Sequence, residues 1–376
     1  MVQVPRSRTG SLDVDTLDAF DLLVAGGAHS MRGWRLHALD LRRRDDTLAR
    51  LDPAGAVLLG CRVTDASNRA LRTRGALLFP PIHAVPFDPY RSRLYTAAEL
   101  YAGVTTGSYE DTLDARVYAW ATVADTVHDL PASLAVALHD HAIAAALAEE
   151  LSTGALAGGP VVGIMGGHAV HRGDAAYTDA ARLGRRLARA GLVVATGGGP
   201  GAMEAGNLGA YLADSPDTAL GAAVNTLART DLEPDGVTAW ARAAFDVLGE
   251  HPGGRASLGI PTWFYGHEPP GPFATHIAKY FANAARESVL LNVCTGGTVF
   301  LPGMAGTVQE IFQEACENYY AAEQQVAPMV LVGREHWENE LPAWPLLRAL
   351  AADRPMRARV HLVDDVDEAY VVLAGA

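Results

Sequence analysis

The feature that most constrains the fold is an alternation in the second half of the chain, where short apolar runs that end in glycine or a polar loop are followed by segments with helical periodicity. Such runs are typical of buried parallel strands, and their alternation with helices predicts an α/β fold with a parallel sheet. The predicted strands are 161–165, 192–195, 220–224, 299–301, 329–332 and 360–363; the predicted helices are 180–190, one after Pro200, 277–290 and one from about Val366.

The length of 376 residues exceeds that of most single cores, so two domains are expected. The texture changes near residues 150–160, where a helical stretch at 133–151, with Ser133 as its expected N-cap, gives way to STGALAGGP. We place the boundary there. An N-terminal α/β domain of unknown role would occupy 1–155, with predicted strands at 56–59 and 76–79 and no recognisable catalytic motif. A Rossmann-like parallel sheet with helices on both faces would occupy 156–376.

Composition and charge exclude several classes of function. The formal net charge of −13 argues against a nucleic-acid partner, since such proteins neutralise phosphates with clustered Lys and Arg. The main basic cluster, Arg42 to Arg44, is interpreted as a solvated helix face. Three cysteines show no metal-ligand spacing, and neither a signal peptide nor a run of about 20 apolar residues is found. We therefore expect a soluble, cytoplasmic protein without a membrane partner.

Three glycine-rich loops each lie between a predicted strand and a predicted helix, at the end of the sheet where parallel α/β proteins bind ligands. They are Gly166-Gly167-His168, Gly197-Gly198-Gly199-Pro200-Gly201 and Pro302-Gly303-Met304-Ala305-Gly306-Thr307. Backbone N–H groups and the positive end of a helix dipole bind phosphate without a lysine, which suits a chain whose single lysine is Lys279. Glycine also serves tight turns for conformational reasons alone. Phosphate binding is favoured over that alternative for the second and third loops and is level with it for the first.

Dinucleotides and nucleoside triphosphates fit these loops less well. The sequence GGGPGAMEAG lacks the G-x-G-x-x-G spacing, and the strand before it ends in Thr196 and glycines, where an acidic residue would hold an adenosine ribose. No G-x-x-x-x-G-K-[ST] sequence is present. An NAD-linked oxidoreductase and a Walker-type NTPase are therefore disfavoured.

The motifs GIMGGHAV at 163–170, GGGPGAMEAGNLGA at 197–210 and PGMAGTVQE at 302–310 resemble those of the LOG family of nucleoside 5′-monophosphate phosphoribohydrolases. Within that family they look most like the larger bacterial nucleotide 5′-monophosphate nucleosidases, over about residues 160–376. The resemblance implies hydrolysis of the N-glycosidic bond of a nucleoside monophosphate, such as AMP, to free base and ribose 5-phosphate. It implies no metal or organic cofactor and a homodimer or larger homo-oligomer.

The family signature PGGxGTxxE ends in a glutamate that aids cleavage with an arginine on the preceding helix, and the resemblance gives these catalytic roles to Glu310 and Arg286. A carboxylate there would stabilise the positive charge that builds on the ribose ring. A second interpretation stays open, because Thr307 to Glu310 is also a helix capping box. The expected substrate-binding residues are Gly167, His168, Gly198, Gly199, Gly201, Met203, Glu204, Gly303, Met304, Ala305, Gly306 and Thr307.

Two positions depart from the family pattern: Met304 replaces a glycine of the signature, and Glu287 follows Arg286 where a lysine is common. Both favour the main alternative function, a non-catalytic nucleotide sensor or cofactor carrier of the same fold.

The Gly- and Pro-rich segment 251–272 is predicted to be a loop over the site. Its aromatic side chains would either stack on the base or anchor the loop to the core, and the sequence leaves both possibilities open. These side chains are Trp263, Phe264, Tyr265 and His267.

Overall fold

The computed structural model describes residues 11–124, 128–264 and 268–375, and the chain divides into two compact units. Unit 1 comprises 1–94 and 123–154; unit 2 comprises 95–122 and 155–376. The segment 95–122, placed in the first domain by the sequence analysis, thus belongs to unit 2. One reason is an antiparallel bridge in which Tyr95 and Ile277 exchange backbone hydrogen bonds of 3.0 and 2.8 Å.

Unit 1 is built on a four-stranded parallel sheet in which each strand pairs with the next one along the chain, in the order β1-β2-β3-β4. Alternate side chains on these strands, among them Val14, Leu36 and Leu58, enter a hydrophobic core on one face. The strands predicted at 56–59 and 76–79 are β3 and β4. The elements of unit 1 are β1 (Leu12–Val14), α1 (Leu17–Ala25), β2 (Trp34–His37), α2 (Asp45–Arg50), β3 (Val57–Leu59), α3 (Asp65–Thr73), β4 (Leu77–Phe79) and α6 (Leu130–Ser152).

The long helix α6 begins one turn earlier than predicted. Its N-cap is Asp129, whose carboxylate accepts the Ala132 N–H, so the expected N-cap at Ser133 is wrong. Pro131 falls in the first turn, where the missing N–H costs no intrahelical hydrogen bond. By length and composition alone α6 could cross a membrane, although no unbroken apolar run exists because His139, Asp140 and His141 interrupt it. A core helix meets the same criteria, and α6 buries a face that includes Ile143.

Unit 2 is built on a seven-stranded parallel sheet in the order β11-β10-β9-β5-β6-β7-β8. Its elements are α4 (Ala97–Leu100), η1 (Tyr109–Asp111), α5 (Leu113–Val123, whose last residue is assigned to unit 1), β5 (Val161–Met165), α7 (Ala175–Arg189), β6 (Val193–Thr196), α8 (Ala202–Tyr211), α9 (Asp217–Leu227), α10 (Leu232–Glu250), β7 (Leu258–Gly259), β8 (His276–Ile277), α11 (Asn283–Val293), β9 (Gly297–Phe300), α12 (Ala305–Tyr320), η2 (Glu323–Gln325), β10 (Met329–Val332), η3 (His336–Glu340), α13 (Ala343–Ala351), η4 (Pro355–Ala358), β11 (Val360–Val363) and α14 (Val366–Ala374).

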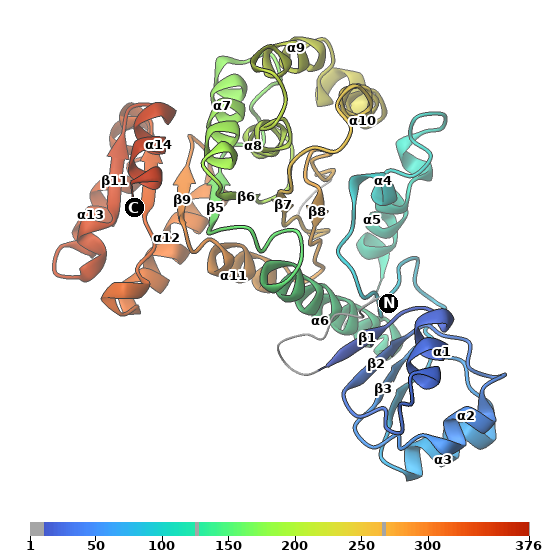
Figure 1. Cartoon of the computed structure of the whole chain (residues 1–376). Helices are drawn as coiled ribbons and strands as arrows, with labels where there is room; N and C mark the ends of the chain where they lie inside the picture. Colours follow the sequence, from blue (N-terminus) through green and yellow to red (C-terminus); the bar gives the residue numbers. More distant parts are fainter. Residues whose placement is uncertain (1–10, 125–127, 265–267, 376) are drawn as a thin grey trace. The chain divides into compact units, whose positions relative to one another are not determined.

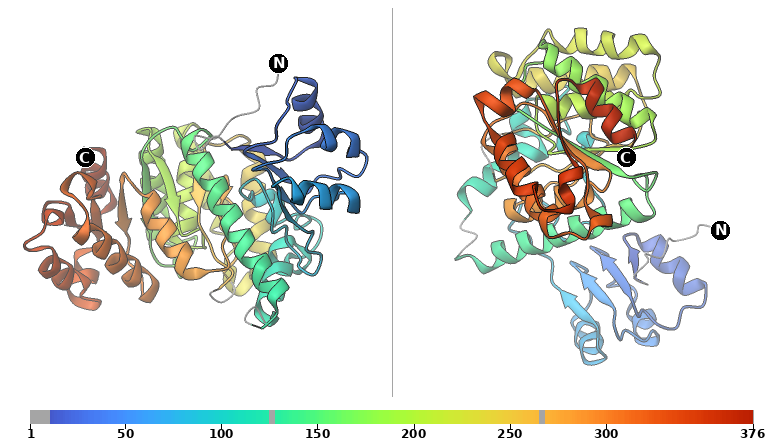
Figure 2. Two further views of the ribbon diagram at one scale, coloured as in Figure 1. Left: turned by 90° about the horizontal axis from the view of Figure 1, so that it is seen from below. Right: turned by 90° about the vertical axis from the view of Figure 1, so that its left-hand side faces the viewer.

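Helices cover both faces of this sheet, as expected for a Rossmann-like fold. Helix α7 packs against α8 and α14, whereas α11 packs against β5 and α12. Figure 1 shows α11 on the side of the sheet opposite α7 and α8, and Figure 2 gives two further views of these layers. The strand order reverses at β5: the chain proceeds from β5 through β6 to β8, and then returns to place β9 on the other side of β5. Parallel α/β proteins bind ligands at such a reversal.

Two predicted elements of unit 2 differ from the structure. The segment 220–224, predicted as a strand, lies within helix α9, where Leu220, Ala223, Val224 and Leu227 are buried at helical spacing. A short apolar run does not by itself distinguish a strand from a buried helix. The helix predicted from 277 begins at Asn283, because residues 276–277 form strand β8 at the edge of the sheet.

Candidate functional site

Three loops that follow β5, β6 and β9 meet at the strand-order reversal, and backbone hydrogen bonds join them. The Gly167 N–H donates to the Pro302 carbonyl, and the Gly167 carbonyl accepts the Ala202 N–H, each at 3.2 Å. Gly201 has a φ of 73°, and a Cβ on it would lie 2.6 Å from the Gly167 oxygen, so only glycine fits there. The glycines predicted to bind substrate therefore lie together at the carboxyl ends of the strands.

The starts of two helices supply backbone N–H groups to this edge. Helix α12 begins at Ala305 with Met304 as its N-cap, and no side chain caps its first turn. Helix α8 begins after Gly201, also without a side-chain cap. The first N–H groups of a helix have no intrahelical acceptor and carry its positive partial charge. Together they form a setting suited to an anion such as a phosphate.

Several glycines of the second and third loops have no room for a side chain. A Cβ on Gly303 would lie 2.2 Å from Thr307 Oγ1, and Gly199 is similarly crowded by the Met203 methyl group, 2.8 Å from its ideal Cβ. A Cβ on Gly198 would lie 2.6 Å from Pro261 Cδ. Gly306 has nothing within 4 Å of its ideal Cβ. Met304 departs from the family pattern without a steric conflict, since its side chain is 69% exposed.

The capping-box interpretation of Glu310 is wrong. The helix starts two residues before Thr307, so Thr307 is not an N-cap and Glu310 lies in the second turn. Instead Glu310 is buried beside Arg286, with 3.8 Å between Oε1 and Nη1. The structure thus brings together the two residues that the resemblance marks as catalytic.

Arg286 is fixed by four contacts around its guanidinium. Nε donates to the Ile260 carbonyl at 2.7 Å and Nη2 to the Gly197 carbonyl at 3.0 Å. Nη1 lies 2.8 Å from Glu287 Oε1, closer than it lies to Glu310. Glu287 therefore takes the strongest ion pair, and the arginine joins the second glycine loop to α12.

Burial raises the pKa of the Glu310 carboxyl to about 7; Arg286 opposes this rise, and the nearby carboxylates of Glu287 and Glu268 add to it. A group with a pKa near neutrality exchanges protons readily at neutral pH, as an acid–base catalyst requires. When Glu310 is protonated, the single positive charge of Arg286 is balanced by Glu287 alone.

Glu204, a predicted substrate-binding residue, is fully buried on α8 and forms an ion pair with Arg172. Arg172 also donates from Nη1 to the Trp240 carbonyl at 2.9 Å and lies over the Trp240 ring, 4.6 Å from its centroid. These contacts join the first loop to α8 and α10. The sequence analysis missed Arg172, although an arginine four residues beyond a glycine loop was a signal that could have singled it out.

A pocket of about 340 Å³ adjoins the loops, and it is lined by His168 to Arg172, Pro200, Gly201, Glu204, 231–233 and Trp240. His168 is exposed and lies 3.7 Å from Glu268, and His171 forms an ion pair with Asp231. Neither Glu310 nor Arg286 lines this pocket. In the part of the chain that the structure describes, no group of three His, Cys, Asp or Glu side chains could hold a metal ion.

The aromatic residues of the 251–272 loop divide between the two interpretations. Trp263 is buried and donates from Nε1 to Asp114 at 3.0 Å, so it anchors the loop to the core. Phe264 is 65% exposed and remains available for stacking. Tyr265 and His267 lie outside the described residues.

The single lysine forms a buried ion pair in unit 2. Lys279 Nζ lies 2.6 Å from Asp114 Oδ1, and each side chain is 1% exposed. Tyr109 donates its hydroxyl to the other carboxylate oxygen at 2.6 Å. The Asp114 carboxylate therefore anchors the segment 95–122 to the residues that follow strand β8, and no property of the local sequence predicts this pairing.

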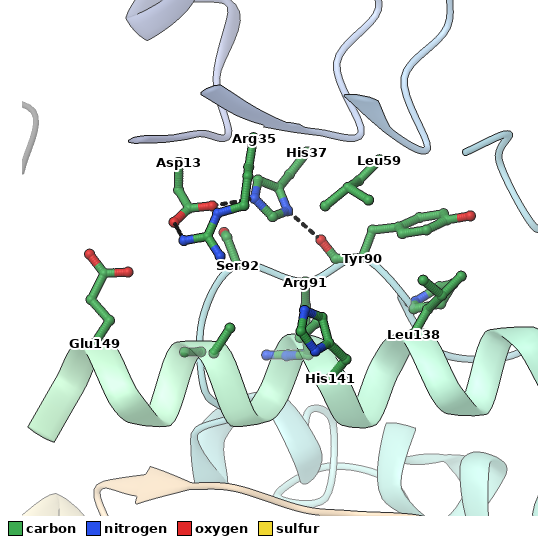
Figure 3. A pocket seen from close by; sticks show the side chains of 14 residues that line it. Asp13, Arg35, His37, Leu59, Tyr90, Arg91, Ser92, Leu138, His141 and Glu149 are labelled. Atoms are coloured by element: carbon green, nitrogen blue, oxygen red, sulfur yellow. Dashed lines mark hydrogen bonds and ion pairs between the residues drawn. The ribbon is translucent and has the colours of Figure 1, made fainter. Parts of the chain in front are cut away.

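Unit 1 contains a separate, small cavity between its sheet and α6 (Figure 3). The Asp13 carboxylate accepts a hydrogen bond from Arg35 Nη2 at 2.7 Å and lies 2.6 Å from His37 Nε2. His37 Nδ1 lies 2.7 Å from the Tyr90 carbonyl oxygen. The cavity measures about 50 Å³, room for a few water molecules. Asp13 is thus paired with two charged side chains of the cavity, and the sequence analysis did not single out these residues.

Comparison with known families supports part of the resemblance. Residues 159–221 match the model of the SLOG cluster4 family, within a superfamily that includes LOG-like folds. The match contains the first two glycine loops and ends before Arg286 and Glu310. Among curated proteins no sequence matches the chain.

Three solved structures match part of the chain at low similarity. The molybdenum cofactor binding protein of Rippkaea orientalis is 17% identical, with a TM-score of 0.36, over 57% of this chain and 96% of that one. Two structures of the molybdenum cofactor carrier protein of Chlamydomonas reinhardtii are 17% and 19% identical, with TM-scores of 0.35 and 0.33. They cover 57% and 58% of this chain and 96% and 99% of those chains.

Proposed function

We propose that unit 2 binds a nucleoside 5′-monophosphate at the three glycine loops and hydrolyses its N-glycosidic bond. The observation that carries the proposal is the buried pair of Arg286 and Glu310, which lie 3.8 Å apart although they come from different helices. The phosphate would lie on the backbone N–H groups that begin α8 and α12. Ribose and base would extend towards the pair.

The proposed hydrolysis requires the phosphate loops, a carboxylate beside the ribose and a water molecule. Loss of the base leaves positive charge on the ribose ring, and an ionised Glu310 would stabilise that charge while orienting the attacking water. Arg286 cannot move freely, since two carbonyls and Glu287 hold it. It would act by keeping the Glu310 carboxylate and the second glycine loop in place.

Incubation with AMP and other monophosphates, followed by chromatography, tests the activity. Free base and ribose 5-phosphate should appear with the wild type, and Glu310→Gln should lower kcat by about 100-fold or more if the carboxylate acts in the reaction. Asp353→Asn, which changes an exposed acid on the turn after α13, is the matched control and should keep the wild-type rate. Equal rates in the wild type and Glu310→Gln would exclude a catalytic role for this carboxylate.

A second candidate function, binding without turnover, is favoured by the closer pairing of Arg286 with Glu287 at 2.8 Å. The family match also covers loops for binding and not the residues proposed for catalysis. A nucleotide sensor or cofactor carrier would have these properties.

Calorimetric titration with AMP separates the two candidates. Tight binding without products in the wild type supports the carrier or sensor. The variant Met304→Gly restores the family signature; turnover that appears only in this variant would mean that Met304 blocks a site otherwise equipped for catalysis.

A further inference from the structure

A second pocket of unit 2, of about 390 Å³, lies between the ends of α11 and α12, away from the glycine loops. Its lining residues include two glutamates and no lysine, arginine or histidine. They are Leu291, Asn292, Cys294, Thr295, Glu314, Glu317, Asn318, Tyr320, Ala321, Gln325 and Ala327. The proposed nucleotide site uses none of them.

Glu314 is the central residue of this pocket. It is 4% exposed, and Oε1 accepts Asn318 Nδ2 at 3.4 Å, whereas the buried Oε2 has no hydrogen-bond partner among the described residues. Asn318 is fixed by two hydrogen bonds with the backbone of Ala327, of 3.0 and 3.1 Å, and so cannot turn to satisfy Oε2. A buried carboxylate oxygen without a donor is costly, and the missing donor would recover that cost.

The electrostatics of the pocket favour a cation. Glu317 lies one turn beyond Glu314 on α12, and the last turns of both α11 and α12 line the pocket. The final carbonyls of a helix lack intrahelical donors and carry its negative partial charge. The end of α12 and two carboxyl groups thus converge, and the lining contains no positive side chain to balance them. Most of the last carbonyls of α11 already accept hydrogen bonds from Cys294 and Thr295.

The protonation state of Glu314 without a ligand follows from its burial. Burial raises the pKa of Glu314 to about 8, and Glu317 raises it further. Burial raises the pKa of Glu317 as well. At neutral pH Glu314 is therefore mostly protonated until a positive partner arrives.

We propose that this pocket binds a small primary amine as its ammonium ion, whose N–H groups donate to Glu314 Oε2 and to carbonyls at the end of α12. An ammonium group has three donors, which matches several separated acceptors better than a single metal ion would. The exposed Tyr320 ring at the pocket's edge offers an additional contact for the cation. Binding converts a protonated Glu314 into a carboxylate, so the protein releases one proton as the ammonium ion binds.

The test is calorimetric titration of the full chain with 1,4-diaminobutane at pH 7, in two buffers of different ionisation enthalpy. The proposal expects saturable binding with release of about 0.9 proton, the protonated fraction of a group with a pKa of about 8. Tetramethylammonium, which has no N–H donor, should bind far more weakly. Glu314→Gln should weaken diamine binding by about tenfold or more, the loss of one charge-assisted hydrogen bond, and abolish the proton release.

Asp353→Asn is again the matched control and should bind the diamine as the wild type does. The Gln side chain can still accept from Asn318, and a urea titration verifies that Glu314→Gln is folded; if it is not, the proton release of the wild type decides alone. The proposal is overturned by absence of binding, by binding without proton release, by equal affinity for tetramethylammonium, or by equal affinity in a folded Glu314→Gln.

Discussion

The effect of Glu310→Gln on the free energy of unfolding can be predicted without knowledge of the substrate. In the folded protein the pKa of Glu310 is raised from 4.5 to about 7. Below pH 4.5 the carboxyl is protonated in both folded and unfolded chains, and its titration costs nothing. Between 4.5 and 7 the unfolded chain ionises first, so the free energy of unfolding falls as pH rises; above 7 the loss is complete.

The size of the effect follows from the two pKa values. By linkage, the raised pKa of Glu310 lowers the free energy of unfolding by about 3 kcal/mol at pH 8 and by about 1 kcal/mol at pH 5. Glutamine has the same shape and no charge to ionise. Glu310→Gln should therefore be more stable than the wild type by an amount that is about 2 kcal/mol larger at pH 8 than at pH 5.

Urea unfolding of the two proteins at both pH values, without nucleotide, measures this difference, and Asp353→Asn should show none. The same group sets the pH dependence of turnover: a Glu310 that acts as a carboxylate gives kcat/KM a rising limb with its midpoint near pH 7. A stability difference independent of pH would refute the assigned burial cost, and a rate that falls through pH 7 would refute the role of the ionised form.

Three further changes test other parts of the structure. Lys279→Met should cost about 3–5 kcal/mol of unfolding free energy, because it leaves the Asp114 carboxylate buried without its counter-charge, and adding Asp114→Asn should recover much of the loss in urea titrations. Gly201→Ala should lower both the unfolding midpoint and AMP affinity, because its Cβ would meet two carbonyls within 2.8 Å, whereas Gly249→Ala, in open space on α10, should leave affinity unchanged and stabilise the helix by about 0.5–1 kcal/mol. Asp13→Ala should lower the thermal midpoint of unit 1, since two charge-assisted hydrogen bonds of about 1.5–3 kcal/mol each are lost. An unchanged midpoint in calorimetry would show that the contacts of Asp13 with Arg35 and His37 do not stabilise the unit.

Local sequence predicted the elements of unit 2 wherever composition and length left one solution. Strands β5 and β10 are continuous apolar runs between polar loops, and the structure has them at the predicted residues. The run 220–224 failed because its apolar residues fit a helical face as well as a strand, and only packing against neighbouring helices decides between them. The convergence of the glycine loops could be predicted, since parallel strands end at a common edge.

The side-chain contacts of the site depend on tertiary packing, which local patterns do not contain. The proximity of Arg286 and Glu310 came only from the family resemblance, and the stronger pairing of Arg286 with its neighbour Glu287 was not predicted. The ion pair of Arg172 with Glu204 joins a loop to a helix that begins 30 residues later. Glu204 lines the pocket with its charge already paired, so any contact with substrate has to compete with the arginine.

Helix α12 connects the two proposals electrostatically. Its N-terminal end supplies unpaired N–H groups to the glycine loops, and its C-terminal end supplies free carbonyls to the acidic pocket. The macrodipole of one helix therefore favours an anion at one site and a cation at the other. Thr307 and Glu317 are separated by about 15 Å along the axis, at 1.5 Å per residue, which exceeds the Debye length of about 8 Å at physiological ionic strength. Charges bound at the two ends are thus largely screened from each other. Glu310 and Glu314 themselves are buried and lie one turn apart on α12, about 6 Å along the axis. The effects of Glu310→Gln and Glu314→Gln on the two ligands should therefore be coupled, because substitutions this close are not independent.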